Sequence, residues 1–219
     1  MFDIRVLIDR MSVDKKEHIM HVAMELFAEK GFEGTSIRDL AQKADVNIAM
    51  VNYYFGSKEK LFEQLLAEKA QFMRTKIEAV ESNETLTEIE KLDHIIDGYV
   101  TRFLTQPNFH RVFLQELLFN QRANLHQHVL SLFEKNTKDV VSIIEKGIKK
   151  KQFKKVDPQL TFISIVGTIN QVMMSKEMCN TLMHESVEHN PYQDPKFKKR
   201  IIEHIKQMVH AHLIITTVS

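Results

Sequence analysis

The sequence predicts an all-α fold made of an N-terminal three-helix domain and a longer C-terminal helical domain. Only 6 glycines and 4 prolines occur in 219 residues, which favours long helices over tight turns. Apolar residues recur at helical spacing along most of the chain, without convincing strand alternation. The polar stretch Glu81 to Thr87 is the best boundary between a domain at 13–80 and a domain at 81–219. Residues 1–12 are expected to be an extension, and Met11 resembles a natural start just before a helix.

Composition indicates an ordinary soluble globular protein. Hydrophobic residues make up 43% of the chain and charged residues 27%. Cys179 is the only cysteine, which excludes an intrachain disulfide and fits a reducing cytoplasm. The most apolar segment, Phe162 to Met174, is shorter than the roughly 18 residues of a membrane span. We therefore expect a cytoplasmic protein without a membrane partner.

The first helix is predicted by an amphipathic pattern that ends at a glycine. Its apolar residues stand at positions i, i+3, i+4, i+7 and i+8, namely Ile19, Val22, Ala23, Leu26 and Phe27. Gly31 follows as the residue after the helix, and Phe32 as the apolar contact beyond it.

Two short helices follow, each with a recognisable cap. Ser36 is predicted to cap the second helix, with Asp39 completing a capping box. Asp45-Val46 forms a short turn, and Asn47 caps a third helix from Ile48 to about Phe55. Gly56 ends this helix, and Ser57 caps a fourth that begins KEKLFEQLL. Two short helices joined by such a turn, after a longer helix, form a helix-turn-helix.

The third helix has the residues expected of a DNA recognition helix. On a helical wheel, Val51 and Phe55 point into the domain. The opposite face carries apolar groups that can touch thymine methyls, and Asn52 can pair with an adenine edge or a phosphate. Arg38 and Lys58 flank this face and could neutralise phosphates. The predicted DNA-binding residues are Ser36, Arg38, Asn47, Ile48, Ala49, Met50, Asn52, Tyr53, Tyr54 and Lys58.

The same residues resemble a known family. The segment TSIRDLAQKADVNIAMVNYYFGSKEKLFEQLL, with the preceding HVAMELFAEKGFEGTS, is similar to the TetR-family signature from about Lys15 to Leu66. The resemblance implies a regulator that binds a palindromic operator as a homodimer, and a repressor that a ligand releases. Asp45 replaces the usual glycine of the turn, which Asp tolerates. Ile48, Ala49 and Asn52 also depart from the common pattern, which affects the expected operator rather than the fold.

The C-terminal half is predicted to form longer helices at about 85–105, 108–122, 125–151, 158–178 and 195–215, with a loop from Met183 to Pro195. The family resemblance implies that the last two helices pair with those of a partner subunit. The predicted interface residues are Ile163, Val166, Gly167, Ile201, Ile205, Met208 and Val209. The alternative is that the segment from Leu160 to Met174 is a buried central helix of a monomer.

A pocket for a small apolar or amphipathic effector is predicted between the C-terminal helices. Phenylalanine and methionine suit adaptable apolar binding surfaces. The candidate lining residues are Phe103, Phe109, Phe113, Phe119, Phe162, Met173 and Met174. The alternative for each of them is ordinary core packing.

Charge leaves a second function open. The net charge is only +1, and between Ser12 and Arg74 we count nine Lys and Arg against ten Asp and Glu. The rival hypothesis is therefore a helical ligand-binding or interaction protein that has lost DNA binding. The basic run Lys149 to Lys155 is expected to be a solvated helix end. No nucleophile elbow, Walker loop or Cys-x-x-Cys pair is present. His204 and His212 share a helix face but lack a cysteine or carboxylate cluster beside them, so we expect no metal site. Because none of these catalytic motifs is present, we also expect no enzyme and no cofactor.

Overall fold

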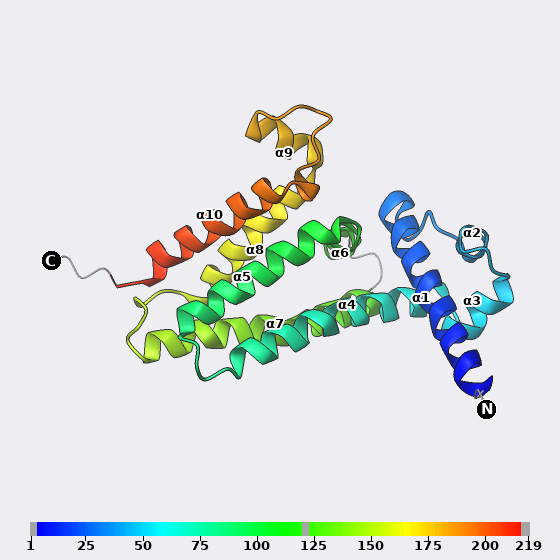
Figure 1. Cartoon of the computed structure of the whole chain (residues 1–219), viewed down its shortest axis with the longest axis horizontal. Helices are drawn as coiled ribbons and strands as arrows, with labels where there is room; N and C mark the ends of the chain where they lie inside the picture. Colours follow the sequence, from blue (N-terminus) through cyan, green and yellow to red (C-terminus); the bar gives the residue numbers. More distant parts are fainter. Residues whose placement is uncertain (1–3, 120–122, 216–219) are drawn as a thin grey trace. The chain divides into compact units, whose positions relative to one another are not determined.

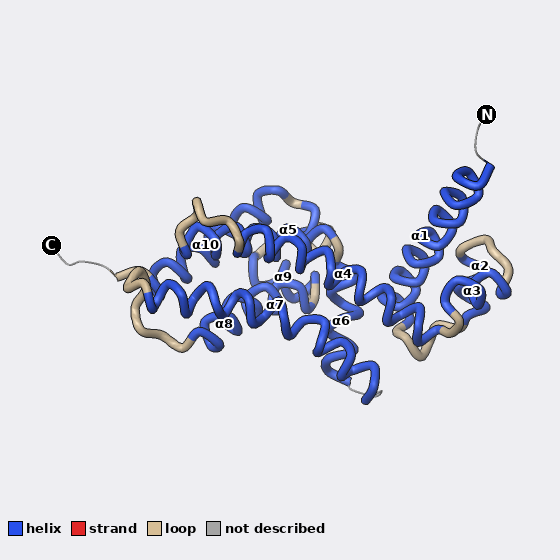
Figure 2. The backbone as a smooth tube through the Cα atoms, turned by 90° about the horizontal axis from the view of Figure 1, so that it is seen from below, coloured by secondary structure: helices blue, strands red, loops and turns tan. Residues whose placement is uncertain are grey.

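The computed structural model describes residues 4–119 and 123–215, with the side chains of 14–118, 127, 130, 131 and 133–215. Over these residues the chain forms ten α-helices and one 3-10 turn, which are joined by loops (Figure 2). No β-strand occurs among the described residues. The predicted all-α fold is confirmed. The chain divides into two compact units: Met1–Lys69 with Arg111–Val129, and Ala70–His110 with Leu130–Ser219.

The first unit contains the three N-terminal helices and the start of the fourth. These are α1 (Ile4–Lys30), α2 (Ile37–Lys43), α3 (Ile48–Phe55) and α4 (Lys58–Glu81), which continues into the second unit. Its core holds a cluster of three aromatic rings: Phe27 stacks on Phe32 with centroids 5.4 Å apart, and Phe62 meets Phe27 edge-on at 5.2 Å. This cluster fixes the end of α1 against the start of α4.

The backbone turns of the first unit follow the sequence signals. Gly31 has φ 73°, and the bonds at the end of α1 include Gly31 N–H to the Phe27 carbonyl at 3.0 Å. Asp45 takes the left-handed conformation, with φ 52°, where a glycine would be the easier choice. Ser36 and Asp39 form the predicted capping box at the start of α2. Local side-chain chemistry therefore sets the ends of these helices.

The second unit is built around α5 (Glu88–Thr105), α8 (Pro158–Met174) and α10 (Pro195–Leu213), which contact one another and lie side by side in Figure 1. The unit also takes α4 from Ala70, the start of α6 (Pro107–Phe119), α7 (Ala123–Lys149) from Leu130, α9 (Lys176–Met183) and the 3-10 turn η1 (Pro191–Gln193). The most enclosed side chains of its core have no exposed surface, and they are Leu92, Ile96, Ile143, Ile144, Ile205 and Leu213. Asp157 and Asp194 cap α8 and α10, each followed by a proline in the first turn.

Two helix boundaries differ from the prediction. The single helix expected at 158–178 is wrong, because Ser175 adopts an extended conformation, with φ −152°, and separates α8 from α9. Its hydroxyl accepts a hydrogen bond from Met178 N–H at 3.2 Å, so it caps the next helix. The apolar pattern continues across this break, which hides it from a periodicity argument. At the other end of the chain, α1 begins at Ile4, so it includes much of the predicted extension.

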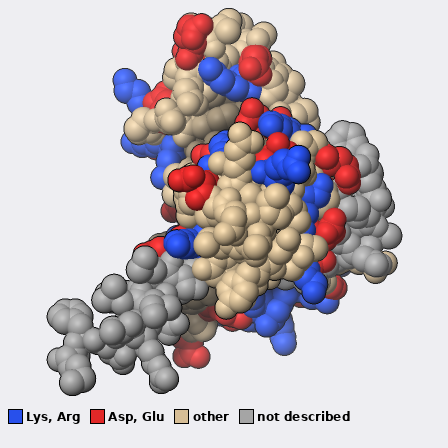
Figure 3. All heavy atoms as spheres, turned by 90° about the vertical axis from the view of Figure 1, so that its right-hand side faces the viewer, with Lys and Arg blue, Asp and Glu red and all other residues tan. Residues whose placement is uncertain are grey.

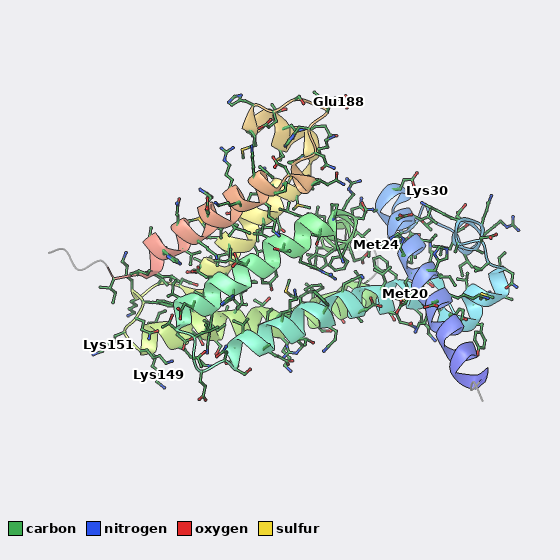
Figure 4. All side chains as sticks on the ribbon, in the orientation of Figure 1. Met20, Met24, Lys30, Lys149, Lys151 and Glu188 are labelled. Atoms are coloured by element: carbon green, nitrogen blue, oxygen red, sulfur yellow. The ribbon has the colours of Figure 1, made fainter. Side chains whose placement is uncertain are left out.

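The basic run at the end of α7 is anchored by one aromatic side chain. Lys149 and Lys151 project from this end in Figure 4, while Lys150 binds Glu88 at 2.6 Å. Phe153 turns back into the core, where a Cβ added at Gly147 would lie 2.2 Å from its ring. Glycine at position 147 is therefore required by the close approach of the Phe153 ring.

Candidate nucleic-acid interface

A short hydrogen-bonded turn joins α2 to α3. Ala44 N–H donates to the Leu40 carbonyl at 2.9 Å, and Val46 N–H donates to the Ala41 carbonyl at 3.0 Å. The left-handed Asp45 lies between these two bonds. Leu40, Ala41 and Ala44 are buried, so the apolar side of α2 is fixed in the core. The turn thereby sets the direction in which α3 leaves α2.

The third helix presents a defined outer face. The Asn47 side chain accepts a hydrogen bond from Met50 N–H at 2.7 Å and caps the helix. Val51 and Phe55 are 1% and 3% exposed and hold the inner face. On the outer side Tyr53 is 83% exposed. Ile48, Ala49 and Asn52 are also exposed, while Met50 and Tyr54 are half-buried. The predicted inward and outward faces are confirmed, whereas contact with DNA stays a prediction.

This outer face is uncharged. No residue of α3 carries a charge. Figure 3 faces the side of the molecule on which Figure 1 draws α2 and α3. Uncharged residues predominate in the middle of this face, and charged side chains surround them. Tyr53 and Tyr54 meet edge-on with ring centroids 5.3 Å apart, so the exposed ring has a neighbour that restricts it. The face suits apolar and neutral hydrogen-bonding contacts rather than ionic ones.

Two of the predicted polar contacts already have roles inside the fold. The Lys58 ammonium donates to the Phe32 carbonyl at 2.8 Å and to the Thr35 carbonyl at 2.9 Å. It also lies 4.1 Å from the centroid of the Phe32 ring. An ammonium has three N–H groups, so a phosphate contact would use the third. The Ser36 hydroxyl is held by Asp39 in the capping box, whereas Arg38 is exposed.

One basic residue near α3 was missed by the sequence argument. Lys16 lies on α1, and its ammonium is 5.8 Å from the centroid of the Phe55 ring. Its position near the end of α3 depends on how α1 crosses α3, which no local pattern reveals. Burial of Phe55 was the only signal available from the sequence. Lys16 joins Arg38 as a candidate phosphate contact.

The predicted effector-binding residues are only partly brought together. Phe103, Phe109 and Met173 are buried in the second unit, and Phe162 packs against its core. Met174 is 63% exposed at the end of α8, which argues against a place in an enclosed pocket. Phe113 belongs to the stretch grouped with the first unit, and the side chain of Phe119 lies outside the described residues.

A pocket of about 360 Å³ occurs elsewhere, in the first unit. Its walls come from the end of α1, the loop after it, α4 and α6, and include Lys30, Phe32, Phe62, Val112, Gln115 and Glu116. None of the predicted effector-binding residues lines this pocket. Helical spacing of aromatic residues therefore did not locate it.

The predicted dimer interface needs correction. Ile201, Ile205 and Val209 are 7%, 0% and 1% exposed, because α10 packs this stripe against α5 and α8 of its own chain. They cannot also contact a partner subunit. Val166 and Met208 are half-buried, whereas Ile163 and Gly167 on α8 are exposed. The apolar stripe of α10 was correctly read as buried but assigned to the wrong neighbour.

Within the part of the chain that the structure describes, no group of three or more His, Cys, Asp or Glu side chains is placed to hold a metal ion. Among the same residues, no helix is long and apolar enough to cross a membrane.

Comparison with known proteins assigns the N-terminal part and the C-terminal part of the chain to one family. Residues 19–65 match the model of the bacterial regulatory proteins of the tetR family, and residues 85–174 match a tetracyclin repressor-like C-terminal domain. The "Probable HTH-type transcriptional regulator YttP" of Bacillus subtilis is 27% identical over 90% of this chain and 92% of its own length. The biofilm operon negative regulator IcaR of Staphylococcus aureus is 39% identical over 22% of this chain and 26% of its own.

Solved structures show the same fold. The ketosteroid transcriptional regulator KstR2 of Mycobacterium tuberculosis matches with a TM-score of 0.72 and 17% identity, over 92% of this chain and 95% of its own. The fatty acid degradation regulator FadR of Bacillus halodurans matches with a TM-score of 0.70 and 20% identity, over 89% and 94%. The matched family model and the helix-turn-helix define a DNA-binding transcriptional regulator. The chain belongs to the TetR family of transcriptional regulators.

Proposed function

We propose that this chain is a repressor that binds a palindromic operator as a homodimer and is released when a small apolar effector binds its C-terminal domain. The observation that carries the proposal is the capped helix α3, whose outer face is exposed and uncharged. An exposed tyrosine and isoleucine beside a half-buried methionine are unusual on a solvated surface. Insertion of α3 into a DNA major groove would account for it.

The side chains of α3 suggest how bases are read. Ile48, Ala49 and Met50 offer apolar contacts for thymine methyl groups, and Asn52 can bind an adenine edge. Because α3 contains neither arginine nor lysine, it cannot make the usual bidentate contact to guanine. Arg38 and Lys16 would contribute phosphate contacts beside the groove. We therefore expect the centre of each half-site to be rich in A·T pairs.

The exposed side of α8 supports the homodimer. Leu160 and Ile163 are each 60% exposed, and Met174, further along the helix, is 63% exposed. Gly167 lies between them, and an added Cβ would meet no atom within 4 Å, so a second helix could approach closely there. A palindromic operator requires the two α3 helices of such a dimer to lie roughly 34 Å apart, one turn of DNA.

An apolar effector is supported by the character of the second unit. Tyr99 and Phe103 lie together with ring centroids 5.7 Å apart, and Phe162 of α8 meets Tyr99 at 6.5 Å. Two structural relatives are named as a ketosteroid regulator and a fatty acid degradation regulator, and both kinds of compound are largely hydrocarbon. We infer a lipid-like or drug-sized effector for this chain.

Reciprocal linkage provides the test of the effector. An effector at 100 times its dissociation constant should raise the free energy of unfolding by about 2.7 kcal/mol. Operator DNA must lower the affinity of the protein for the effector by the same factor by which the effector lowers its affinity for the operator. Compounds found by thermal shift are titrated with and without operator DNA, and a scrambled duplex is the control. Effector affinities that operator DNA leaves unchanged would contradict the proposed release.

A further inference from the structure

Two polar side chains in the second unit are sealed from solvent and make no hydrogen bond to the residues that the structure describes. His110 on α6 and Asn136 on α7 are each 1% exposed. Neither ring nitrogen of His110 has a hydrogen-bond partner among the described residues, and neither does the amide nitrogen or oxygen of Asn136. Such groups are rare in folded proteins because burial removes their water without replacing it. They lower stability unless something else fills their hydrogen-bonding capacity.

Other buried polar residues that the structure describes, such as Asn180, Thr161 and Glu88, each use at least one polar side-chain atom in a hydrogen bond or ion pair. Asn180, 2% exposed, donates from its amide nitrogen to the Ser186 and His189 carbonyls, both at 2.9 Å. Thr161 donates to the Asp157 carbonyl at 2.7 Å. These side chains hold the backbone of their own unit in place. His110 and Asn136 lack any comparable structural role, although Asn136 is the same residue type as Asn180.

His110 stands at the end of a row of aromatic rings. Its ring centroid is 4.4 Å from that of Phe103, and the row continues through Tyr99 to Phe162. The rings come from α6, α5 and α8 of one unit. An apolar molecule lying against these rings would meet a hydrogen-bonding group at one end.

The surroundings favour an uncharged partner for both residues. Burial lowers the pKa of His110 from 6.5 to about 4, so the imidazole is neutral at physiological pH. A neutral imidazole has one donor and one acceptor, and an asparagine amide also offers both. Neither side chain supplies the net charge that a buried carboxylate or ammonium needs. Hydroxyl, carbonyl and ester groups match this chemistry.

We propose that His110 and Asn136 are the polar contacts of the effector, and that the effector is an apolar molecule bearing an uncharged hydrogen-bonding group. The proposal rests on the ligand response proposed above. It goes further because it assigns the chemical class of the polar end and the two residues that bind it. Both residues reduce the stability of the empty protein and are used when the effector is bound.

Stability of the empty protein gives the first test. His110→Phe and Asn136→Leu replace unpaired polar groups with apolar groups of similar size, so each should raise Tm by roughly 2–4 °C. Asn180→Leu is the matched control and should lower Tm, because it removes two hydrogen bonds. Differential scanning calorimetry measures all three. A fall in Tm for His110→Phe and Asn136→Leu, as large as for Asn180→Leu, would show a structural role such as binding of an internal water.

The second test uses two probes of equal chain length, 1-decanol and decanoate, at pH 8. We expect 1-decanol to bind the wild type about tenfold or more tightly than decanoate, and each variant to lose about tenfold of that affinity. Tighter binding of decanoate, or no binding of 1-decanol to the wild type, overturns the assigned class. Operator release is read separately by gel shift, so failure of the ligand response is distinguished from failure of the residue assignment.

Discussion

Tyr53→Ala is expected to weaken specific operator binding by about 1–3 kcal/mol, roughly 5- to 150-fold in Kd. Tyr53 is the most exposed large apolar side chain of α3 and lies against Tyr54, so its removal takes away a prearranged contact. The fold should not change, because the side chain packs little inside the domain. Fluorescence anisotropy with the operator duplex measures the affinity, and thermal unfolding checks the fold.

Two matched changes separate the contributions at this position. Tyr53→Phe retains the ring and removes the hydroxyl, so it should lose only the part of the affinity due to a phosphate contact. Asn52→Ala should lose affinity mainly for sites with adenine at the contacted position, by a similar 1–3 kcal/mol. Wild-type affinity for Tyr53→Ala, with a folded domain, would show that the recognition face is misassigned.

Ile205→Glu is expected to unfold the second unit. Ile205 has no exposed surface and belongs to the core that α10 forms with α5 and α8. An unpaired buried charge there should cost several kcal/mol, a large part of the roughly 5–15 kcal/mol that stabilises a typical domain. Circular dichroism and urea unfolding measure the loss.

Ile163→Glu is the matched control. Ile163 lies on the exposed side of α8, whereas Ile205 lies on the buried side of α10, which packs against α8. Ile163 is 60% exposed on α8, so the protomer should keep its fold while the dimer dissociates. Multi-angle light scattering at micromolar concentration should give a monomer for this variant and a dimer for the wild type. A folded, dissociated Ile205→Glu protein, or a dimeric Ile163→Glu protein, would restore the interface predicted from the sequence.

The first unit could be predicted closely because its signals are local. The caps and the turn depend on side chains that act on backbone only a few residues away: Ser36 and Asn47 cap α2 and α3, and Asp45 forms the turn. Such short-range effects can be predicted from the residue type alone. The inner face of α3 follows from Val51 and Phe55 at a spacing of four residues. These features do not depend on which helices pack together.

The second unit could not be predicted to the same depth because its features depend on tertiary packing. Periodicity showed that Ile201, Ile205 and Val209 are buried but not that α5 covers them. The break at Ser175 is set by a cap inside a continuous apolar pattern. Unpaired burial of His110 and Asn136 depends on neighbours distant in sequence, so no local pattern marks these residues.

Selection of bound duplexes from a random DNA pool, followed by footprinting, tests sequence-specific dimeric binding most directly. The selected sites should contain two inverted half-sites about one helical turn apart, each with an A·T-rich centre, and each site should bind one dimer. Replacing a contacted thymine by uracil should weaken binding, because it removes the methyl group that the face of α3 can contact. Recovery of no common sequence, or of a single unpaired half-site bound by a monomer, would contradict an operator-binding dimer.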